Sequence, residues 1–151
     1  MNDAPILLAE DNPDDVLLTR RAFAKTGFDN PVLDVPDGEA CLDALLAETA
    51  PDSRTGPAAE PAFLLLDINL PKINGLDVLR RLRSDPHTRL LPVVLLTTSR
   101  EQRDVLAGYR LGANSYVCKP VSFTGFVAVI HTLATYWLRV NEPRPLPGGP
   151  R

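Results

Sequence analysis

The sequence predicts an α/β fold, a doubly wound (βα)5 arrangement in which five parallel strands form one sheet. Two observations lead to this prediction. Short apolar runs alternate five times with longer stretches that carry apolar residues at helical spacing. The runs contain few polar residues, which is typical of strands buried on both faces of a parallel sheet. Because the crossover connections between such strands are right-handed, we expect helices on both faces of the sheet.

The predicted strands comprise residues 6–9, 32–35, 63–66, 92–96 and 115–118. The run at 63–66 contains only Phe and Leu and is followed by Asp67. We therefore expect it to be a central strand that delivers a carboxylate to its carboxyl end. The run at 32–35 is interrupted by Asp34, which favours a position at an edge of the sheet.

The predicted helices begin after residues that cap helices well. Asn12 is followed by Pro13 at the first helical position, and Asp37 and Ser122 can cap the second and the last helix. The third helix follows residues 74–75, and the fourth covers roughly 100–111 and ends at Gly112. The last helix has one apolar face, made of Phe123, Phe126, Val127, Ile130, Leu133, Ala134 and Trp137.

Length and composition predict one domain. The chain has 151 residues, enough for a single hydrophobic core. We expect this domain to cover residues 3–140. The last eleven residues, 141–151, include four prolines and two glycines and are predicted to be a disordered tail. Residues 50–61 lack any apolar period and are predicted to form a long surface loop.

Charge, hydropathy and cysteine spacing exclude several classes of protein. The net charge of -3 argues against nucleic acid as a partner. No apolar run is long enough to cross a membrane, and the first residues lack the basic start of a signal peptide. Cys41 and Cys118 are far apart and form no CxxC pair, so we expect buried thiols in a reducing compartment. These features predict a cytoplasmic location, without nucleic acid or a membrane as a partner.

Polar residues follow four of the predicted strands. They are Glu10 and Asp11, Asp67, Thr97, and Lys119. Because the carboxyl ends of parallel strands meet at one edge of a sheet, we expect these side chains to surround one cleft. Three carboxylates this close repel one another unless a cation offsets their charge. Mg²⁺ suits such a site, since it is held by few protein oxygens and leaves positions for water and phosphate.

This set of side chains suits phosphoryl transfer. Asp67 can act as a carboxylate nucleophile and form an acyl phosphate. Mg²⁺ held by Asp11, Asp67 and a backbone carbonyl would neutralise one side of the phosphoryl group, and Lys119 another. The Thr97 hydroxyl can donate to a phosphoryl oxygen. Taken alone, Lys119 fits a surface charge and Thr97 a strand-end cap, but their coincidence with the acids favours the phosphoryl site.

The same residues resemble the receiver domain of two-component response regulators. The resemblance covers roughly residues 6–137 and implies a flavodoxin-like fold. The matching pieces are the pair Glu10-Asp11, Asp67 followed by Pro71 and Gly75, Pro92 leading to Thr97, and Tyr116 followed by Lys119-Pro120.

The resemblance implies the identity of the phosphoacceptor and of its metal ligands. Asp67 would take a phosphoryl group from a sensor histidine kinase. Asp11, Asp67 and the carbonyl of Asn69 would bind Mg²⁺, and Glu10 would act through a water molecule.

The resemblance also implies the residues that read the phosphoryl group. Lys119 and Thr97 would contact it, and Thr97 together with Tyr116 would form the switch. Pro71, Gly75 and Pro120 would shape turns, and the bond between Lys119 and Pro120 would be cis. Phosphorylation would remodel the surface made of the fourth helix, fifth strand and fifth helix.

The loop at 50–61 and the aromatic end of the last helix look like single-domain regulators that are paired with bacterial phytochrome kinases. On that helix Tyr136 and Leu138 lie off the main apolar row, beside Trp137. An exposed apolar strip there suits a homodimer or another protein partner. Packing under the tail, or scattered exposure, is the alternative.

The sequence thus predicts a stand-alone phosphorylation switch, with at most slow phosphorylation by small donors and slow self-dephosphorylation. A phosphatase of the haloacid-dehalogenase type is the main alternative. That class has a second Asp two residues after the nucleophile, whereas this chain has Asn69. A scaffold that is never phosphorylated is disfavoured, because every part needed for phosphorylation is present.

Overall fold

The computed structural model describes residues 2–46 and 60–145 of the chain. Its sheet has five parallel strands in the order β2-β1-β3-β4-β5. This order is that of flavodoxin-like folds. The strands are β1 (Ile6–Ala9), β2 (Val32–Val35), β3 (Phe63–Leu66), β4 (Val93–Thr97) and β5 (Ser115–Cys118). The predicted fold class is confirmed, with residues 63–66 at the centre and 32–35 at an edge.

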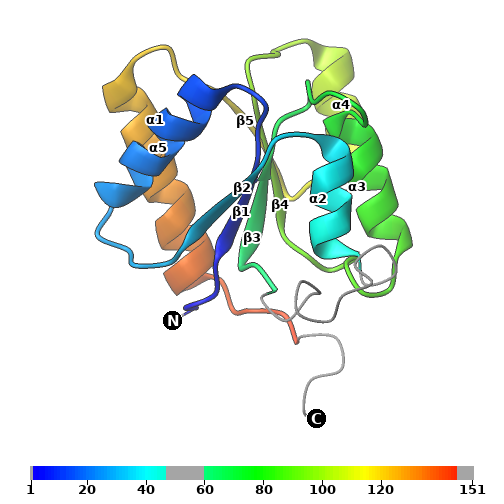
Figure 1. Cartoon of the computed structure of the whole chain (residues 1–151), viewed down its shortest axis with the longest axis horizontal. Helices are drawn as coiled ribbons and strands as arrows, with labels where there is room; N and C mark the ends of the chain where they lie inside the picture. The colour runs from blue at the N-terminus through cyan, green and yellow to red at the C-terminus, as the bar shows by residue number, and fades with distance from the viewer. Residues whose placement is uncertain (1, 47–59, 146–151) are drawn as a thin grey trace.

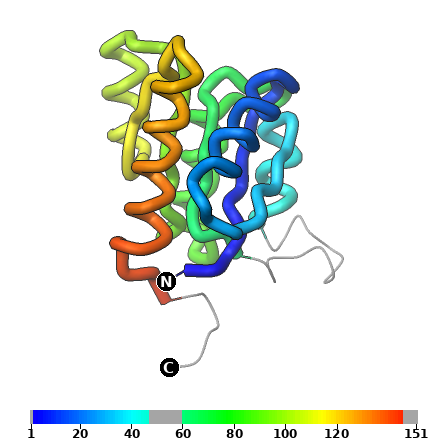
Figure 2. Tube along the Cα trace, turned by 90° about the vertical axis from the view of Figure 1, so that its left-hand side faces the viewer, coloured from blue at the N-terminus to red at the C-terminus, as the bar shows by residue number. Residues whose placement is uncertain are grey.

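Two helical layers enclose the sheet, as Figures 1 and 2 show. One layer contains α1 (Pro13–Ala24) and α5 (Phe123–Thr135), and the other contains α2 (Gly38–Leu45), α3 (Gly75–Ser84) and α4 (Gln102–Arg110). The side chains of Asn12, Asp37 and Ser122 each accept a hydrogen bond from a backbone N–H in the first turn of their helix. The predicted caps are therefore confirmed, and Asn74 caps α3 in the same way.

The core consists of two apolar layers, one on each face of the sheet. Leu64 and Leu66 of β3 pack in the layer that includes α2 and α3, whereas Phe63 and Leu65 pack in the layer that includes α1 and α5. All four side chains are fully buried. Burying each contributes about 1.5–3 kcal/mol relative to exposure, so β3 is a firm support for the residue that follows it.

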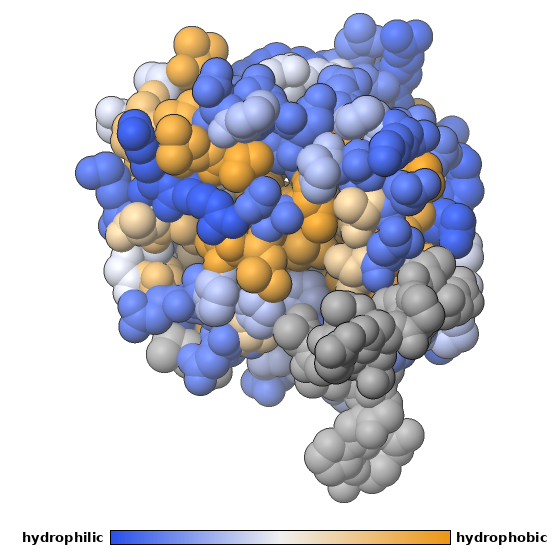
Figure 3. Space-filling view, viewed as in Figure 1, coloured by the Kyte–Doolittle hydropathy of each residue, from blue (hydrophilic) through white to orange (hydrophobic). Residues whose placement is uncertain are grey.

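Strand β2 is one of the two edge strands of the sheet and lies on the face of the molecule that Figure 3 shows. Figure 3 shows an apolar band across the middle of this face, between the two helical layers, where β2 lies in Figure 1. Leu33 of β2 is about half exposed, and Asp34 forms an ion pair with Arg20 of α1. A charged residue on an edge strand discourages pairing with another chain.

The end of α5 departs from the prediction. The helix continues into a π-helical turn, η2 (Tyr136–Val140), closed by a hydrogen bond of 2.7 Å from the Asn141 N–H to the Tyr136 carbonyl. Tyr136 is 46% exposed, but Trp137 and Leu138 are 8% and 1% exposed. The prediction that Leu138 lies on an exposed strip is wrong, because the wider π turn brings two consecutive side chains onto the core.

The two ends of the described chain lie together at the amino-terminal edge of the sheet (Figure 1). The Asn2 N–H donates to the Leu138 carbonyl at 2.9 Å. Arg144, inside the predicted tail, pairs with the buried carboxylate of Glu60 at 3.2 Å. Residues 141–145 contain neither helix nor strand. The remainder of the tail, and the predicted loop apart from its last two residues, lie outside the described residues.

Both cysteines are free, but their surroundings differ. Cys41 is fully buried, and burial raises the pKa of its thiol to about 12. Cys118 is only partly buried and is the last residue of β5, at the carboxyl edge of the sheet. Within residues 2–46 and 60–145, no helix has both the length and the apolar character that crossing a bilayer requires.

Candidate functional site

Lys119 is the centre of the polar cluster at the carboxyl edge of the sheet. It follows β5, and its Nζ lies 2.6 Å from Glu10 Oε1, 3.1 Å from Asp15 Oδ2 and 3.2 Å from Asp67 Oδ2. Glu10 follows β1 and Asp67 follows β3. Strands β1 and β3 are adjacent, and only β4 separates β3 from β5, so the three groups come from nearby strands. The predicted convergence is observed here for Glu10, Asp67 and Lys119.

Sequence reasoning missed Asp15. It lies in the first turn of α1, where carboxylates are favoured by the helix dipole. Because α1 begins only a few residues after β1, its first turn stands above the strand ends, and Asp15 reaches Lys119. The signal in the sequence was its place in the first turn of a helix that begins directly after the Glu10-Asp11 pair.

Three acids form a group that fits a divalent cation. Glu10, Asp11 and Asp67 each offer a carboxylate oxygen, and these oxygens lie within 4.8 Å of one another. Glu10 and Asp67 are buried, whereas Asp11 is exposed. Hard carboxylate oxygens are the ligands that Mg²⁺ and Mn²⁺ prefer. The predicted acidic metal site is therefore present in its donor set.

Three carboxylates contact a single ammonium group in this cluster, so negative charge is in excess. Burial raises the pKa of the Glu10 carboxyl to about 7, even though its hydrogen bond to Lys119 acts in the opposite direction. Burial by itself would lower the pKa of Lys119, but the hydrogen bond to Glu10 and the charges of Asp67 and Glu10 raise it above its ordinary value. Lys119 therefore stays charged, and an additional cation would relieve Glu10.

The loop after β3 holds Asp67 in place. The Asn69 N–H donates to Asp67 Oδ1 at 3.2 Å, and the Gly75 N–H donates to the Ile68 carbonyl at 2.8 Å. A Cβ on Gly75 would lie 2.1 Å from the Asp67 carbonyl oxygen, so only glycine allows α3 to start here. The Pro71 carbonyl accepts from the Ile73 N–H at 2.8 Å, which closes the turn. The predicted turn positions Pro71 and Gly75 lie against this loop.

Thr97 and Tyr116 meet at a residue that was not singled out from the sequence, Ser99. Thr97 is fully buried at the end of β4, and its Oγ1 accepts from the Ser99 N–H at 3.4 Å. The Tyr116 hydroxyl donates to the Ser99 carbonyl at 2.9 Å, and the Ser99 hydroxyl donates to Asp104 of α4 at 2.6 Å. Ser99 thus connects β4, β5 and α4. Its position two residues after Thr97 was the available signal.

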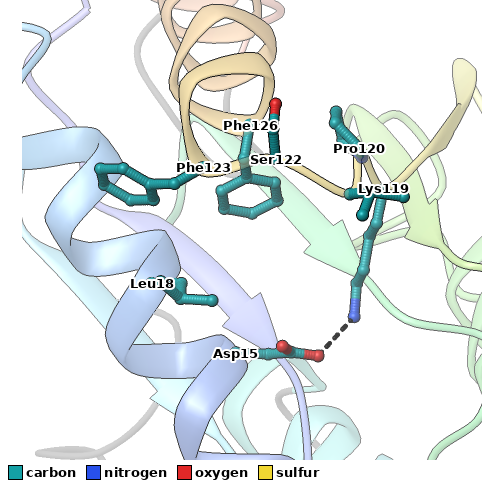
Figure 4. A pocket seen from close by; sticks show the side chains of 8 residues that line it. Asp15, Leu18, Lys119, Pro120, Ser122, Phe123 and Phe126 are labelled. Atoms are coloured by element: carbon teal, nitrogen blue, oxygen red, sulfur yellow. Dashed lines mark hydrogen bonds and ion pairs between the residues drawn. The ribbon is translucent and has the colours of Figure 1, made fainter.

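A pocket of about 170 Å³ adjoins Lys119 between α1 and the start of α5 (Figure 4). Its lining residues are Asp15, Leu18, Lys119, Pro120, Val121, Ser122, Phe123 and Phe126. Figure 4 shows Lys119 and Asp15 facing each other at one end of it, with the two Phe rings at the other.

Pro120 lies between Lys119 and the start of α5, as expected, but its peptide bond does not have the expected isomer. None of the described peptide bonds is cis, so the expectation of a cis bond between Lys119 and Pro120 is wrong. The trans form is the lower-energy form of an X–Pro bond by about 0.5–1 kcal/mol.

The family model of the response regulator receiver domain matches residues 6–131. Among characterised relatives, the probable methanogenesis regulatory protein FilR2 of Methanothrix harundinacea is 37% identical over 91% of this chain and 85% of its own length. Response regulator Rcp1 of Synechocystis sp. is 31% identical over 88% of each chain.

Solved structures agree with this match. The phosphorylated cyanobacterial phytochrome response regulator RcpA superposes with a TM-score of 0.85 and 30% identity, over 95% of this chain and all of its own. The Mn²⁺-bound form of Rcp1 gives 0.82 and 29%, over 94% and 99%. The bacteriophytochrome response regulator RtBRR gives 0.72 and 46%, over 94% and 84%.

Proposed function

The chain belongs to the response regulator receiver family, and from this premise we propose that Asp67 accepts a phosphoryl group from a histidine kinase, with Mg²⁺ as the cofactor. One observation carries the proposal. The Asp67 carboxylate is buried at a strand end, 3.2 Å from Lys119 Nζ and within a group of three acids. A phosphatase of the haloacid-dehalogenase type is set aside because the receiver family model covers residues 6–131.

In the proposed reaction an oxygen of the Asp67 carboxylate forms a bond to phosphorus. The bond between phosphorus and the imidazole nitrogen of the donor breaks, and that nitrogen keeps the electron pair as the neutral imidazole leaves. The Asn69 N–H donates to Asp67 Oδ1 at 3.2 Å and helps to fix the orientation of the carboxylate. Lys119 offers its ammonium to the negative charge of the phosphoryl oxygens, and Thr97 offers its hydroxyl.

Asp11, Asp67 and the Asn69 carbonyl would hold the Mg²⁺ ion, and Glu10 would act on it through a water molecule. When bound, the ion supplies positive charge for the phosphoryl oxygens. The cluster suits such a cation, because three carboxylates lie together and Lys119 offsets only part of their charge. The Mn²⁺-bound form of Rcp1 supports a divalent ion in a relative of this fold.

The switch proposal concerns Thr97 and Tyr116. A phosphoryl group adds about two negative charges at pH 7, and movement of the Thr97 hydroxyl toward it would disturb the contact with the Ser99 N–H. The Tyr116 hydroxyl is bonded to the carbonyl of that same residue. Phosphorylation would thereby shift the population of the surface formed by α4, β5 and α5, to the extent that it binds one conformation better.

A sensor histidine kinase is the proposed partner, and the pocket beside Lys119 supports it. Exposed apolar side chains of Leu18, Val121 and Phe123 line this pocket together with Lys119, which contacts the phosphoacceptor. Exposed apolar side chains that gather beside polar groups are typical of surfaces that bind another protein. Because RcpA and RtBRR are phytochrome response regulators, a bacteriophytochrome is the kinase proposed.

We also propose that the surface formed by α4, β5 and α5 binds a second copy of the chain or another protein. Leu106 and Tyr109 of α4 and Tyr136 after α5 are about half exposed. Trp137 and Leu138 are buried and serve as its support rather than as contacts. The variant Tyr136→Glu should fold normally and lower the mass of any dimer measured by light scattering. An unchanged dimer mass would remove Tyr136 from this surface.

The phosphoacceptor is tested by labelling with acetyl phosphate. Wild-type protein in Mg²⁺ should gain the mass of one phosphoryl group, and Asp67→Asn should gain none. Chelation of divalent ions should abolish the gain in the wild type. Phosphate found on a residue other than Asp67 by peptide mapping would contradict the assignment.

A further inference from the structure

The hydrogen-bonding capacity of Lys119 is fully used in the structure. A lysine ammonium has three N–H donors and no acceptor. Three carboxylate oxygens lie within hydrogen-bond distance of Nζ, one each from Glu10, Asp15 and Asp67. If a phosphoryl oxygen is to be bound by Lys119, one of these three acceptors has to be displaced.

The three acceptors differ in how firmly they are held. The Glu10 side chain is 4% exposed and makes the shortest of the three contacts, and the Asp67 side chain, 9% exposed, is the phosphoacceptor itself. The Asp15 side chain is 34% exposed and lines the pocket between α1 and α5. Water can therefore solvate the Asp15 carboxylate when it loses Lys119, whereas Glu10 would be left buried without its partner.

We infer that Asp15 is a positioning residue. In the unphosphorylated protein it accepts a hydrogen bond from one N–H of Lys119. A phosphoryl oxygen takes over that N–H when Asp67 is phosphorylated. This inference rests on the proposed function and names a regulation of the same site. Asp15 holds the ammonium next to Asp67 before the donor arrives, and it releases one hydrogen bond when the donor binds.

Two costs follow for a small anionic donor. The bond to Asp15 has to be exchanged, and the charge of Asp15 repels the donor. The two contacts to Nζ place Asp15 Oδ2 no more than about 6 Å from Asp67 Oδ2, close enough for like charges to repel one another at an effective dielectric constant of about 20. Asp15 therefore slows phosphorylation by free small donors, and the site favours a donor that a partner protein positions.

The test uses acetyl phosphate at saturating Mg²⁺. An Asp67 oxygen then forms the bond to phosphorus, the bond between phosphorus and the acetyl oxygen breaks, and acetate leaves with the electron pair. The variant Asp15→Asn should raise the second-order rate constant by about five- to tenfold. Asp15→Glu keeps the charge and should return the rate to within about twofold of the wild type.

Asp14 provides the matched control. It is the neighbouring acid in the same turn of α1, it is exposed, and it is not one of the three acceptors of Lys119. Asp14→Asn removes the same charge from the same helix end but leaves the three contacts of Lys119 in place. Its rate constant should therefore stay within about twofold of the wild type. Equal acceleration by both variants would show a general charge effect and overturn the inference.

A second readout does not depend on phosphorylation. Lys119 can be followed by NMR of ¹³Cε-labelled lysine, since Lys25 and Lys72 are the other lysines of the chain. Asp15→Asn should shift the Lys119 signal in the unphosphorylated protein, and addition of beryllofluoride with Mg²⁺ should make the two proteins alike. A signal that is unaltered by Asp15→Asn would overturn the inference.

The outcomes separate the two claims. A wild type that takes no phosphate on Asp67 would contradict the proposed function. A wild type that is labelled on Asp67, with an Asp15→Asn variant that reacts no faster, would contradict the inference alone. A purely structural role of Asp15 predicts a slower and less stable variant, so thermal unfolding of the same proteins completes the comparison.

Discussion

Glu10 should make the metal-free protein less stable as the pH rises. Its carboxyl group is 4% exposed, and burial raises its pKa from 4.5 to about 7 in the folded protein. Between these two values the folded protein keeps a proton on Glu10 that the unfolded chain has released. Stability therefore falls through this interval, because the folded state binds more protons than the unfolded state.

The magnitude follows from the change in pKa. A difference of one in pKa corresponds to about 1.4 kcal/mol, so the rise to about 7 corresponds to about 3 kcal/mol. The free energy of unfolding should lose this amount between about pH 4.5 and pH 7, and the loss should remain at higher pH. Lys119 does not contribute in this interval, because its pKa is raised from an ordinary value of 10.5.

The assay compares wild type with Glu10→Gln, which carries no titrating group at this position. Free energies of unfolding are measured by urea denaturation in a chelator of divalent ions at several values between pH 4.5 and pH 8. The stability of the wild type relative to Glu10→Gln should decrease by about 3 kcal/mol across this range. Glu142→Gln, which removes an exposed carboxylate, is the matched control. A difference that stays constant within about 1 kcal/mol, or that grows with pH, would refute the reasoning.

Three other predictions concern the supports of the site. Gly75→Ala places a methyl group 2.1 Å from the Asp67 carbonyl oxygen. It should lower the free energy of unfolding, measured by urea denaturation, by about 1–3 kcal/mol and slow labelling by acetyl phosphate. An unchanged labelling rate would contradict the role of this loop in holding Asp67. Asp37→Ala removes the cap of α2 and should cost about 1 kcal/mol without changing that rate; equal stability to wild type would contradict the role of the cap. Tyr116→Phe removes the hydrogen bond to Ser99 and should lower the free energy of unfolding by about 1 kcal/mol. The rate of labelling of Asp67 should stay within about twofold of the wild type, while hydrogen exchange in α4 changes. Unaltered exchange would argue against this contact as part of the switch.

The sequence alone was sufficient for the sheet and for the gathering of Glu10, Asp67 and Lys119 at one edge of it. The apolar runs at residues 63–66 and 92–96 predict buried parallel strands because burial on both faces leaves a local pattern in the chain. Once the strands are parallel, the position of Glu10, Asp67 and Lys119 at one edge follows from topology. The caps at Asn12 and Asp37 could be read in the same way, since a cap involves residues two or three positions apart.

The tertiary structure decided which side chains meet and which are covered. Lys119 reaches Glu10 across 109 positions and Asp15 across 104, and no local pattern records such a contact. The exposure of Leu138 depends on a π turn at the end of α5, which a regular helical period does not describe. Local periodicity therefore determined the strands, the helices and the edge where the polar residues gather. The partners of Lys119 and the covering of Leu138 depended on packing between distant segments, which only the folded chain defines.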